Sequence, residues 1–287
     1  MSGTGFVTRF APSPTGRLHL GHAFSALTAY EAAKAAGGRF LLRIEDIDFT
    51  RSRPEFEAAI FEDLAWLGVS WETPVLRQSE QMADYLAALE TLRARNLVYR
   101  CFKTRRAVLD SIASAPHGPT APYCGAPLSP AEERARLEAG EPFAWRLSLT
   151  AAEREAGPLT FDEEGEGPGG ERGVIAVDAS GAGDVVLARK DVGVAYHLAV
   201  AVDDARQGVT CVIRGQDLFE AAHVQRLLQA LLGLPAPTYR HHRLLMGPDG
   251  RRLAKRDKAE ALRTLRQSGI TSAQIRSRIG IEPARSA

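Results

Sequence analysis

Apolar and polar positions in the first third of the chain follow the spacings expected of strands and helices. Residues 6–10 form a short apolar-rich run that stops at Pro12, which predicts a first strand. The alanine-rich stretch from residue 23 to residue 36 predicts a long helix, because the two glycines that follow it are suited to end one. Residues 40–44 are mostly apolar, as parallel strands buried on both faces are, and they predict a second strand.

A second helix is predicted from Pro54. Four apolar residues after it repeat at helical spacing, namely Phe56, Ile60, Leu64 and Leu67. The order strand, helix, strand, helix is typical of a doubly wound parallel sheet, so the predicted fold class is α/β with a Rossmann-like core. A regular α/β pattern returns in residues 195–202 and 208–214 and in a helix over residues 221–232.

The middle of the chain lacks this regularity. Proline, glycine and acidic residues crowd between residues 114 and 173, with only short strand-like pieces such as residues 143–149. We interpret this region as an inserted subdomain, and we expect residues 163–173 to be an exposed hairpin tip or a mobile loop. After Pro235 we expect one basic loop and two helices.

These patterns divide the chain into four predicted parts. Residues 1–99 and 191–234 would form the two halves of the Rossmann-like domain. Residues 100–190 would form the inserted subdomain, and residues 235–287 a lysine-containing loop and a short C-terminal helical segment. No internal repeats occur.

Composition narrows the class of protein only in part. Of the 287 residues, 45% are apolar and 25% are charged, which is the profile of a soluble globular protein. No run approaches the roughly 18 apolar residues of a membrane helix, and no secretory signal is visible at the start. Three cysteines, Cys101, Cys124 and Cys211, are too few for a disulfide framework, so we expect a reducing, cytoplasmic location.

The distribution of charge is more informative than its sum. The net charge of +1 does not by itself indicate a nucleic-acid-binding protein. Basic residues nevertheless gather in two stretches, residues 93–106 and 240–258. These stretches are either solvated faces or nucleic-acid contacts, and charge alone leaves both interpretations open.

The most specific motif joins the first strand to the first long helix. The string Arg9-Phe10-Ala11-Pro12-Ser13-Pro14-Thr15-Gly16 is followed by His19-Leu20-Gly21-His22. A helix N-terminus after a proline-rich turn points free amides and a positive dipole end outward, where two histidines can donate hydrogen bonds to phosphate oxygens. Gly21 leaves room for a flat ring to lie against the backbone. Taken alone, the motif also fits a helix cap with two surface histidines.

A second motif lies near the other end of the chain. The basic string Arg252-Leu253-Ala254-Lys255-Arg256 follows the turn Gly247-Pro248-Asp249-Gly250. A mobile loop with a central lysine can close on a triphosphate and neutralise charge that develops in the transition state. Such a loop is weak evidence alone, but its combination with the first motif is a strong signal.

With these two motifs as its signatures, the chain resembles class I aminoacyl-tRNA synthetases. The second signature departs from the usual lysine-methionine-serine-lysine-serine string, but its functional lysine is kept as Lys255. Three further strings narrow the resemblance to the glutamyl and glutaminyl branch: residues 9–16, 43–48 and 213–218. The resemblance extends from about residue 6 to Lys258.

Length narrows the resemblance further. Fewer than about thirty residues follow Lys258, whereas a full glutamyl-tRNA synthetase continues for roughly another domain. The chain is therefore similar to the glutamyl-Q tRNA(Asp) synthetases, which place glutamate on the queuosine base of tRNA(Asp). This resemblance implies an acceptor-contacting inserted subdomain and no anticodon-binding domain.

The glutamate pocket must hold two carboxylates and one ammonium, and a buried carboxylate needs a cation, for which arginine has bidentate geometry. Arg9 and Arg214 are the candidates for the side-chain carboxylate, Glu45 for the ammonium and Tyr196 for a hydrogen bond along the substrate. The resemblance assigns the same positions. It adds Phe10, Ala11, Pro12 and Ser13 to the expected glutamate-binding residues.

The expected reaction is attack of the glutamate α-carboxylate on the α-phosphorus of ATP, which needs positioning and charge neutralisation but no protein nucleophile. The expected catalytic residues are His19, His22 and Lys255. These three, with Ser13 and Gly21, are the expected ATP-binding residues, and magnesium is expected to bridge ATP oxygens. The expected partners are L-glutamate, ATP and tRNA(Asp) carrying queuosine, with no membrane contact and a monomeric state.

Relatives of this branch hold zinc in the insertion with Cys-x-Cys followed by Tyr-x-x-x-Cys. Here Cys101 and Tyr123 remain, but Lys103 and Pro127 occupy the other two ligand positions. A rearranged set with His117 and Cys124 is conceivable, although structural zinc requires four nitrogen or sulfur ligands. We therefore expect that zinc is lost.

Two other functions compete with this interpretation. The chain could be a fragment of a glutamyl-tRNA synthetase that charges the 3′ end of tRNA(Glu). It could also be a non-catalytic tRNA-binding paralogue. The presence of His19, His22, Glu45 and Lys255 together disfavours the second alternative, because a binding module does not need that set.

Overall fold

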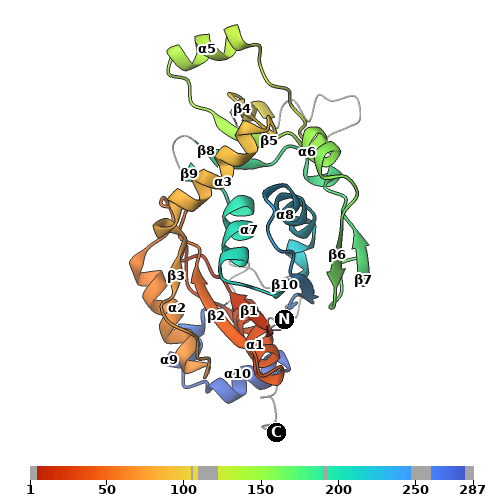
Figure 1. The fold of residues 1–287 in the computed structure, drawn as a ribbon. Coiled ribbons are helices and arrows are strands. Elements are labelled where there is room, and N and C mark those ends of the chain that lie inside the picture. Colours follow the sequence, from red (N-terminus) through yellow and green to blue (C-terminus); the bar gives the residue numbers. More distant parts are fainter. Residues whose placement is uncertain (1–4, 105, 109–121, 190–192, 247–259, 282–287) are drawn as a thin grey trace.

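The central sheet is parallel and doubly wound (Figure 1). The structure is a computed structural model that describes residues 5–104, 106–108, 122–189, 193–246 and 260–281. Strands β1 (Val7–Phe10), β2 (Arg39–Ile44) and β3 (Leu76–Arg77) pair in the order β1-β2-β3. Beside β1 lies β10 (Cys211–Gly215), where the Thr210 N–H donates to the Val7 carbonyl at 2.9 Å, and β11 (Thr238–His242) pairs in parallel with β10. The predicted fold class is confirmed.

The two helices of the first half form where their sequence signals lie. Helix α1 (Leu20–Ala35) starts three residues before the predicted position, because His19 and His22 cap it, and it ends before Gly37, which has φ +58°. Helix α2 (Pro54–Trp66) has Pro54 in its first turn, where the missing N–H costs nothing. Ile60 on α2 is fully buried in one core with residues of α1, β2 and β10.

The second half contains α7 (Tyr196–Arg206) and α8 (Phe219–Leu232), as the returning pattern predicted. The prediction of only a loop and helices after Pro235 is wrong for β11. This strand has the sequence Thr-Tyr-Arg-His-His, in which alternate residues Tyr239 and His241 are buried. A polar sequence therefore forms a central strand, in which the side chains of Tyr239 and His241 find hydrogen-bond partners inside the protein.

The inserted region carries an antiparallel sheet in the order β4-β5-β8-β9. Its strands are β4 (Val98–Cys101), β5 (Ala144–Leu147), β8 (Val186–Arg189) and β9 (Gly193–Val194). Its helices are α5 (Pro130–Glu138) and α6 (Leu149–Ala156), and α3 (Met82–Ala94) leads into it. Helix α5 has no buried residue and projects from the tip of the insertion (Figure 1).

A hairpin of β6 (Thr160–Glu163) and β7 (Gly173–Ala176) connects the insertion to the central sheet. Strand β6 pairs in parallel with β11, so the sheet continues in the order β10-β11-β6-β7. Residues 168–170 are exposed, as predicted for a hairpin tip. The base of the loop is fixed, because the N–H groups of Glu164 and Glu166 donate to the carbonyls of Tyr239 and His241.

The C-terminal segment holds the two predicted helices, α9 (Leu262–Gln267) and α10 (Ser272–Ile279). It is tied to the start of α1, because the Leu262 N–H donates to the Leu18 carbonyl at 2.9 Å. Short 3₁₀ turns lie at Gln78–Glu80, Ser180–Ala182 and Gln216–Leu218. None of the helices in the described part of the chain has the length and apolar character needed to cross a bilayer.

One buried carboxyl group lies between α2 and α9. Asp63 is completely buried, and neither of its oxygens accepts a hydrogen bond from the described residues. The nearest cation is Arg266, whose Nη2 lies 3.8 Å from Oδ1. Burial raises the pKa of Asp63 to about 6, and the attraction of Arg266 only partly opposes this. The folded protein therefore holds this proton more tightly than the unfolded chain does, so ionisation of Asp63 reduces stability as the pH rises from about 4 to 6.

Asp63→Asn should remove this pH dependence. The free energy of unfolding of the variant minus that of the wild type, both measured by urea denaturation, should increase by about 1 to 3 kcal/mol when the pH is raised from 4.5 to 7.5. The reason is that the asparagine cannot ionise. The matched control is Glu62→Gln, which changes the exposed neighbour that also contacts Arg266 and should shift stability by less than about 0.5 kcal/mol at either pH. Parallel pH profiles of Asp63→Asn and the wild type would contradict the assignment.

Candidate active site

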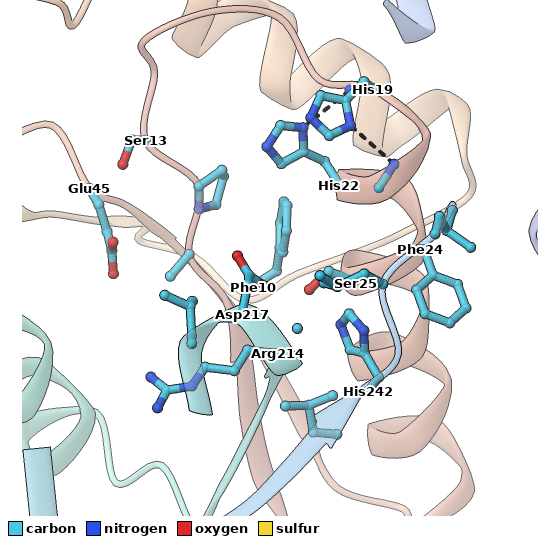
Figure 2. Close-up of a pocket in the computed structure, with 18 of the residues that line it drawn as sticks. Phe10, Ser13, His19, His22, Phe24, Ser25, Glu45, Arg214, Asp217 and His242 are labelled. Carbon is cyan, nitrogen blue, oxygen red and sulfur yellow. Dashed lines mark hydrogen bonds between the residues drawn. The ribbon is translucent and has the colours of Figure 1, made fainter. Parts of the chain in front are cut away.

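A cavity of about 420 Å³ opens at the carboxyl ends of the parallel strands, beside the N-terminus of α1 (Figure 2). This position, where the two halves of a doubly wound sheet meet, is where such folds bind their ligands. The cavity brings together every predicted binding residue that the structure describes: Arg9, Phe10, Ala11, Pro12, Ser13, His19, Gly21, His22, Glu45, Tyr196 and Arg214. Lys255 lies outside the described residues.

Two histidines cap the helix at one end of the cavity. The backbone N–H of Gly21 donates to His19 Nδ1 at 3.1 Å, and the backbone N–H of His19 donates to His22 Nδ1 at 3.2 Å. Because each Nδ1 accepts a hydrogen bond, the neutral form of each ring carries its proton on Nε2. The cap therefore fixes both rings as Nε2–H donors at a helix N-terminus, which is suited to phosphate oxygens.

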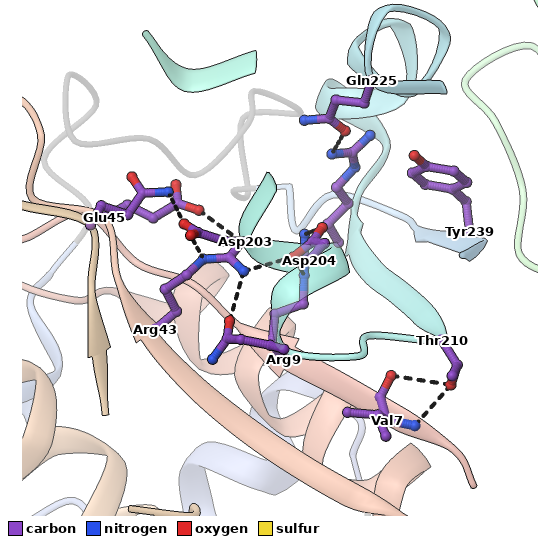
Figure 3. A network of polar contacts seen from close by, with 12 residues as sticks. Val7, Arg9, Arg43, Glu45, Asp203, Asp204, Thr210, Gln225 and Tyr239 are labelled. Carbon is purple, nitrogen blue, oxygen red and sulfur yellow. Dashed lines mark hydrogen bonds and ion pairs between the residues drawn. The ribbon is translucent and has the colours of Figure 1, made fainter. Parts of the chain in front are cut away.

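A buried ionic network lies beside the cavity (Figure 3). Arg9 holds Asp204 in a two-bond pair, with Nε to Oδ1 at 3.0 Å and Nη2 to Oδ2 at 3.2 Å. Arg43, which is fully buried, donates to Asp204 at 2.7 Å and to Glu45 at 3.2 Å. Asp203 lies 3.8 Å from Arg43 Nε and accepts hydrogen bonds from the side chains of Tyr85 and Gln78.

The carboxyl groups of this network outnumber its guanidinium groups. Burial would raise the pKa of Asp204, but Arg9 and Arg43 outweigh it and hold that pKa at about 2. Burial dominates at Glu45 and raises its pKa above the ordinary value, although Arg43 and Arg9 oppose it. Three carboxyl groups thus share two guanidinium groups. Glu45 lines the cavity, so an ammonium placed there would supply the missing positive charge.

Arg214 is a buried cation for which the described residues supply no anionic partner. Its side chain is only 4% exposed, Nε donates to His241 Nε2 at 3.0 Å, and Nη1 donates to Gln225 Oε1 at 2.8 Å. Both acceptors are uncharged groups, and among the described residues no carboxylate pairs with Arg214 and nothing accepts from its Nη2. A buried guanidinium in a cavity wall with an unfilled N–H is suited to bind a carboxylate.

The structure brings the predicted residues together, and its two candidate arginines have different partners. Arg9 and Arg214 were both candidates for the substrate carboxylate, yet Arg9 gives Nε and Nη2 to Asp204 and only Arg214 lacks an anionic partner in the described part of the chain. Arg43, Asp203 and Asp204 were missed as parts of the site. Two adjacent acidic residues after the apolar run of residues 195–202 were the available signal.

The expected zinc position does not fit a metal. Cys101 Sγ lies 3.7 Å from Tyr123 Oη. Burial, and to a smaller extent this contact, raises the pKa of Tyr123 to about 12. Two cations face the same ring, with Lys103 Nζ 5.4 Å and the Arg146 guanidinium 4.7 Å from its centroid. Cys124 is exposed, and His117 lies outside the described residues. Within the described ranges no three His, Cys, Asp or Glu side chains cluster as metal ligands would.

A buried carboxylate organises this part of the insertion. Asp184 is 4% exposed and accepts hydrogen bonds from the Tyr99 hydroxyl at 2.7 Å and from the backbone N–H groups of Gly125 at 2.7 Å and Leu149 at 2.8 Å. Its own N–H donates to the Tyr123 carbonyl at 2.7 Å. These bonds join four separate segments around one side chain, which is a role that a structural metal has in other proteins.

Comparison with known proteins agrees with the geometry of the cavity. Residues 6–281 match the family model described as tRNA synthetases class I (E and Q), catalytic domain. A glutamyl-Q tRNA(Asp) synthetase of Rhodobacter capsulatus is 48% identical over 96% of this chain and 100% of its own length. A protein of the same name from Nocardia farcinica is 43% identical over 94% of this chain and 82% of its own length.

A solved structure is similar as well. The glutamate-tRNA synthetase of Elizabethkingia anophelis superposes with a TM-score of 0.74 and 31% identity, over 88% of this chain. The chain spans 53% of the length of that structure.

The purified protein should contain well below one zinc per chain. Lys103 and Pro127 stand where two ligands are needed, and two cations face Tyr123, which disfavours a tetrahedral zinc set there. Elemental analysis tests the content, and treatment with a chelator should leave the melting temperature unchanged. The control is Cys101→Ser with Cys124→Ser, which should leave the metal content as it is. Stoichiometric zinc that disappears in this double variant would contradict the prediction.

Proposed function

The chain belongs to the family of class I tRNA synthetases (E and Q), which are ATP-dependent ligases, and on this premise we propose that it activates L-glutamate and transfers it to the queuosine base of tRNA(Asp). The proposal that the amino acid is glutamate rests on the buried Arg214 guanidinium. This group lines the cavity and has no anionic partner among the described residues. The choice of tRNA is supported by the likeness to relatives that are named for this reaction.

The cavity offers a separate place for each charge of glutamate. Arg214 would bind the side-chain carboxylate, and Glu45, in the network where carboxyl groups outnumber guanidinium groups, would bind the ammonium. Tyr196 lines the same cavity and would donate a hydrogen bond to the substrate. Glutamine carries no charge on its side chain, so it would leave the Arg214 guanidinium buried without an anion, which disfavours its binding.

The histidines at the start of α1 would hold the phosphates of ATP. Their Nε2–H groups, at a helix N-terminus, would donate to the phosphate oxygens, and Gly21 would let the nucleotide approach the backbone. Magnesium bound to ATP would neutralise part of the phosphate charge. Lys255, outside the described residues, would stabilise the charge that develops on the leaving pyrophosphate.

Two bond exchanges complete the proposed reaction. A glutamate α-carboxylate oxygen attacks the α-phosphorus of ATP, the bond from that phosphorus to the bridging oxygen breaks, and pyrophosphate leaves. A hydroxyl group of the queuosine base then attacks the carbonyl carbon of the mixed anhydride, loses its proton and displaces AMP. The product is an ester of glutamate on the tRNA.

The nucleotide that receives glutamate decides between this proposal and its rivals. The protein should attach labelled glutamate, in the presence of ATP, to tRNA from a bacterium that makes queuosine, and nuclease digestion should locate the label on the queuosine nucleotide. Enzymatic removal of the 3′-terminal adenosine should leave the labelling unchanged, and tRNA that lacks queuosine should receive no label. Label at the 3′ end of tRNA(Glu) would favour the first rival, and no label on any tRNA would favour a non-catalytic protein.

Arg214→Ala should weaken the use of glutamate selectively. Loss of the cation leaves the substrate carboxylate buried without a charged partner, so the KM for glutamate in glutamate-dependent pyrophosphate exchange should rise roughly a hundredfold, and discrimination against glutamine should fall. The matched control is Arg240→Ala, which removes a partly exposed arginine that pairs with Glu164. A variant at position 214 that still rejects glutamine as strongly as the wild type does would show that another residue selects the side chain.

A further inference from the structure

Arg214 is held by a chain of two buried side chains that neither the motifs nor the proposed reaction uses. Arg214 lies on β10 and is paired in register with His241 on β11. The second ring nitrogen of His241 meets Glu163, the last residue of β6, with Nδ1 2.5 Å from Oε2. The side chains of His241 and Glu163 have no exposed surface. The three residues thus link three neighbouring strands, one of which belongs to the hairpin of the insertion.

The contacts determine which nitrogen of His241 carries the proton. Arg214 Nε always carries a hydrogen and points at His241 Nε2, so Nε2 must present a lone pair. The proton of the neutral ring is then on Nδ1, where it is donated to the Glu163 carboxylate. Burial lowers the pKa of His241, although Glu163 opposes this. Burial would raise the pKa of Glu163, but its hydrogen bonds to His241 outweigh this and lower it. The ring is therefore neutral and accepts from Arg214.

Glu163 itself cannot turn. Its Oε1 accepts the backbone N–H of His241 at 2.9 Å and that of Gly165 at 2.8 Å, which leaves Oε2 for the imidazole. The hairpin backbone comes so close at this point that a Cβ on Gly165 would meet the His241 carbonyl oxygen at 2.2 Å. Only glycine allows this approach, so the position of the carboxylate depends on the local backbone of the hairpin.

Two neutral acceptors thus fill two positions of a planar guanidinium. His241 takes Nε and Gln225 takes Nη1, which fixes the plane of Arg214 and leaves Nη2 without an acceptor among the described residues. A carboxylate in place of either acceptor would neutralise Arg214 and weaken its attraction for a substrate anion. Neutral acceptors orient the cation but preserve its charge.

We propose that Glu163 and His241 are positioning residues for substrate selection, which hold Arg214 in the orientation that binds the side-chain carboxylate of the amino acid. This inference rests on the proposed function, because it names residues that serve the same site. Neither residue touches the substrate. Glu163 acts only through the tautomer of His241, and His241 acts only through Arg214.

Glu163→Gln tests the proposal with a change of a single atom. The two backbone N–H groups should keep the amide oxygen at the Oε1 position, so the amide nitrogen faces His241 Nδ1 and donates to it. The ring must then carry its proton on Nε2. Two N–H donors, His241 Nε2–H and Arg214 Nε–H, would then face each other, and the hydrogen bond between them would be lost. The KM for glutamate in pyrophosphate exchange should rise tenfold to a hundredfold, whereas kcat and the KM for ATP should change less than about threefold.

The matched control is Glu164→Gln, the same change at the next residue of the hairpin, where the carboxylate is partly exposed and pairs with Arg240. It should leave the KM for glutamate unchanged. A merely structural role of Glu163 would lower the melting temperature and affect ATP and glutamate alike. Such a uniform loss in Glu163→Gln would overturn the proposal.

The His241 tautomer supplies a second measurement that needs no activity. Nitrogen-15 NMR of the ring should show a protonated Nδ1 in the wild type and a protonated Nε2 in Glu163→Gln. Two variants at position 241 add a rescue test. His241→Phe, which has no acceptor, should lose glutamate affinity as Glu163→Gln does, and His241→Gln, which can offer its amide oxygen to Arg214, should keep most of it.

Different results would overturn the proposed function and the positioning role of Glu163 and His241. A wild-type protein without glutamate-dependent exchange, with or without tRNA, would overturn the proposed function. An active wild type with an unchanged glutamate KM in Glu163→Gln would overturn the positioning role alone. An unchanged His241 tautomer in that variant would overturn it as well.

Discussion

The pairing of Arg43 with acidic groups is the interaction on which the rest of the site depends. Arg43 is fully buried on β2, and its guanidinium reaches Glu45 on the same side of the sheet and Asp204 on α7. Leaving one partner of a buried ion pair alone typically costs about 3 to 5 kcal/mol, so none of these charges is dispensable once the others are present. An apolar replacement of the whole set could nevertheless be as stable. What apolar residues could not supply is an excess of carboxyl groups over guanidinium groups beside the cavity.

Two kinds of buried arginine follow from this arrangement. Arg9 and Arg43 are neutralised by carboxylates, whereas Arg214 is held by an imidazole and an amide. The cavity therefore has an acidic wall near Glu45 and a cationic wall at Arg214, with His19 and His22 apart from both (Figure 2). A substrate with an ammonium and a side-chain carboxylate matches both walls. Selection by charge needs this separation, because a cation already paired in the apo protein would attract an anion only weakly.

Sequence patterns predicted the fold where the signal is local. Prolines and glycines mark the ends of α1 and α2, and apolar spacing marks their buried faces. Strand β11 was missed because its buried residues Tyr239 and His241 are polar-tipped and lie among polar neighbours. The strand–turn–helix motif put both histidines at the start of the first long helix, where a local cap determines their geometry. The pair of Arg43 with Asp204 joins residues 161 positions apart, and no periodicity or spacing can reveal such a contact.

The insertion is more than an attachment to the catalytic sheet. Strand β6 extends that sheet beyond β11, and its last residue, Glu163, reaches the imidazole that orients Arg214. Any displacement of the hairpin base would move the Glu163 carboxylate, since the backbone at Gly165 packs directly against the backbone of β11. The cavity wall at Arg214 and the inserted region are therefore in contact through one buried pair. A chain that recognises RNA with one part and an amino acid with another would have, in this pair, a contiguous path between them.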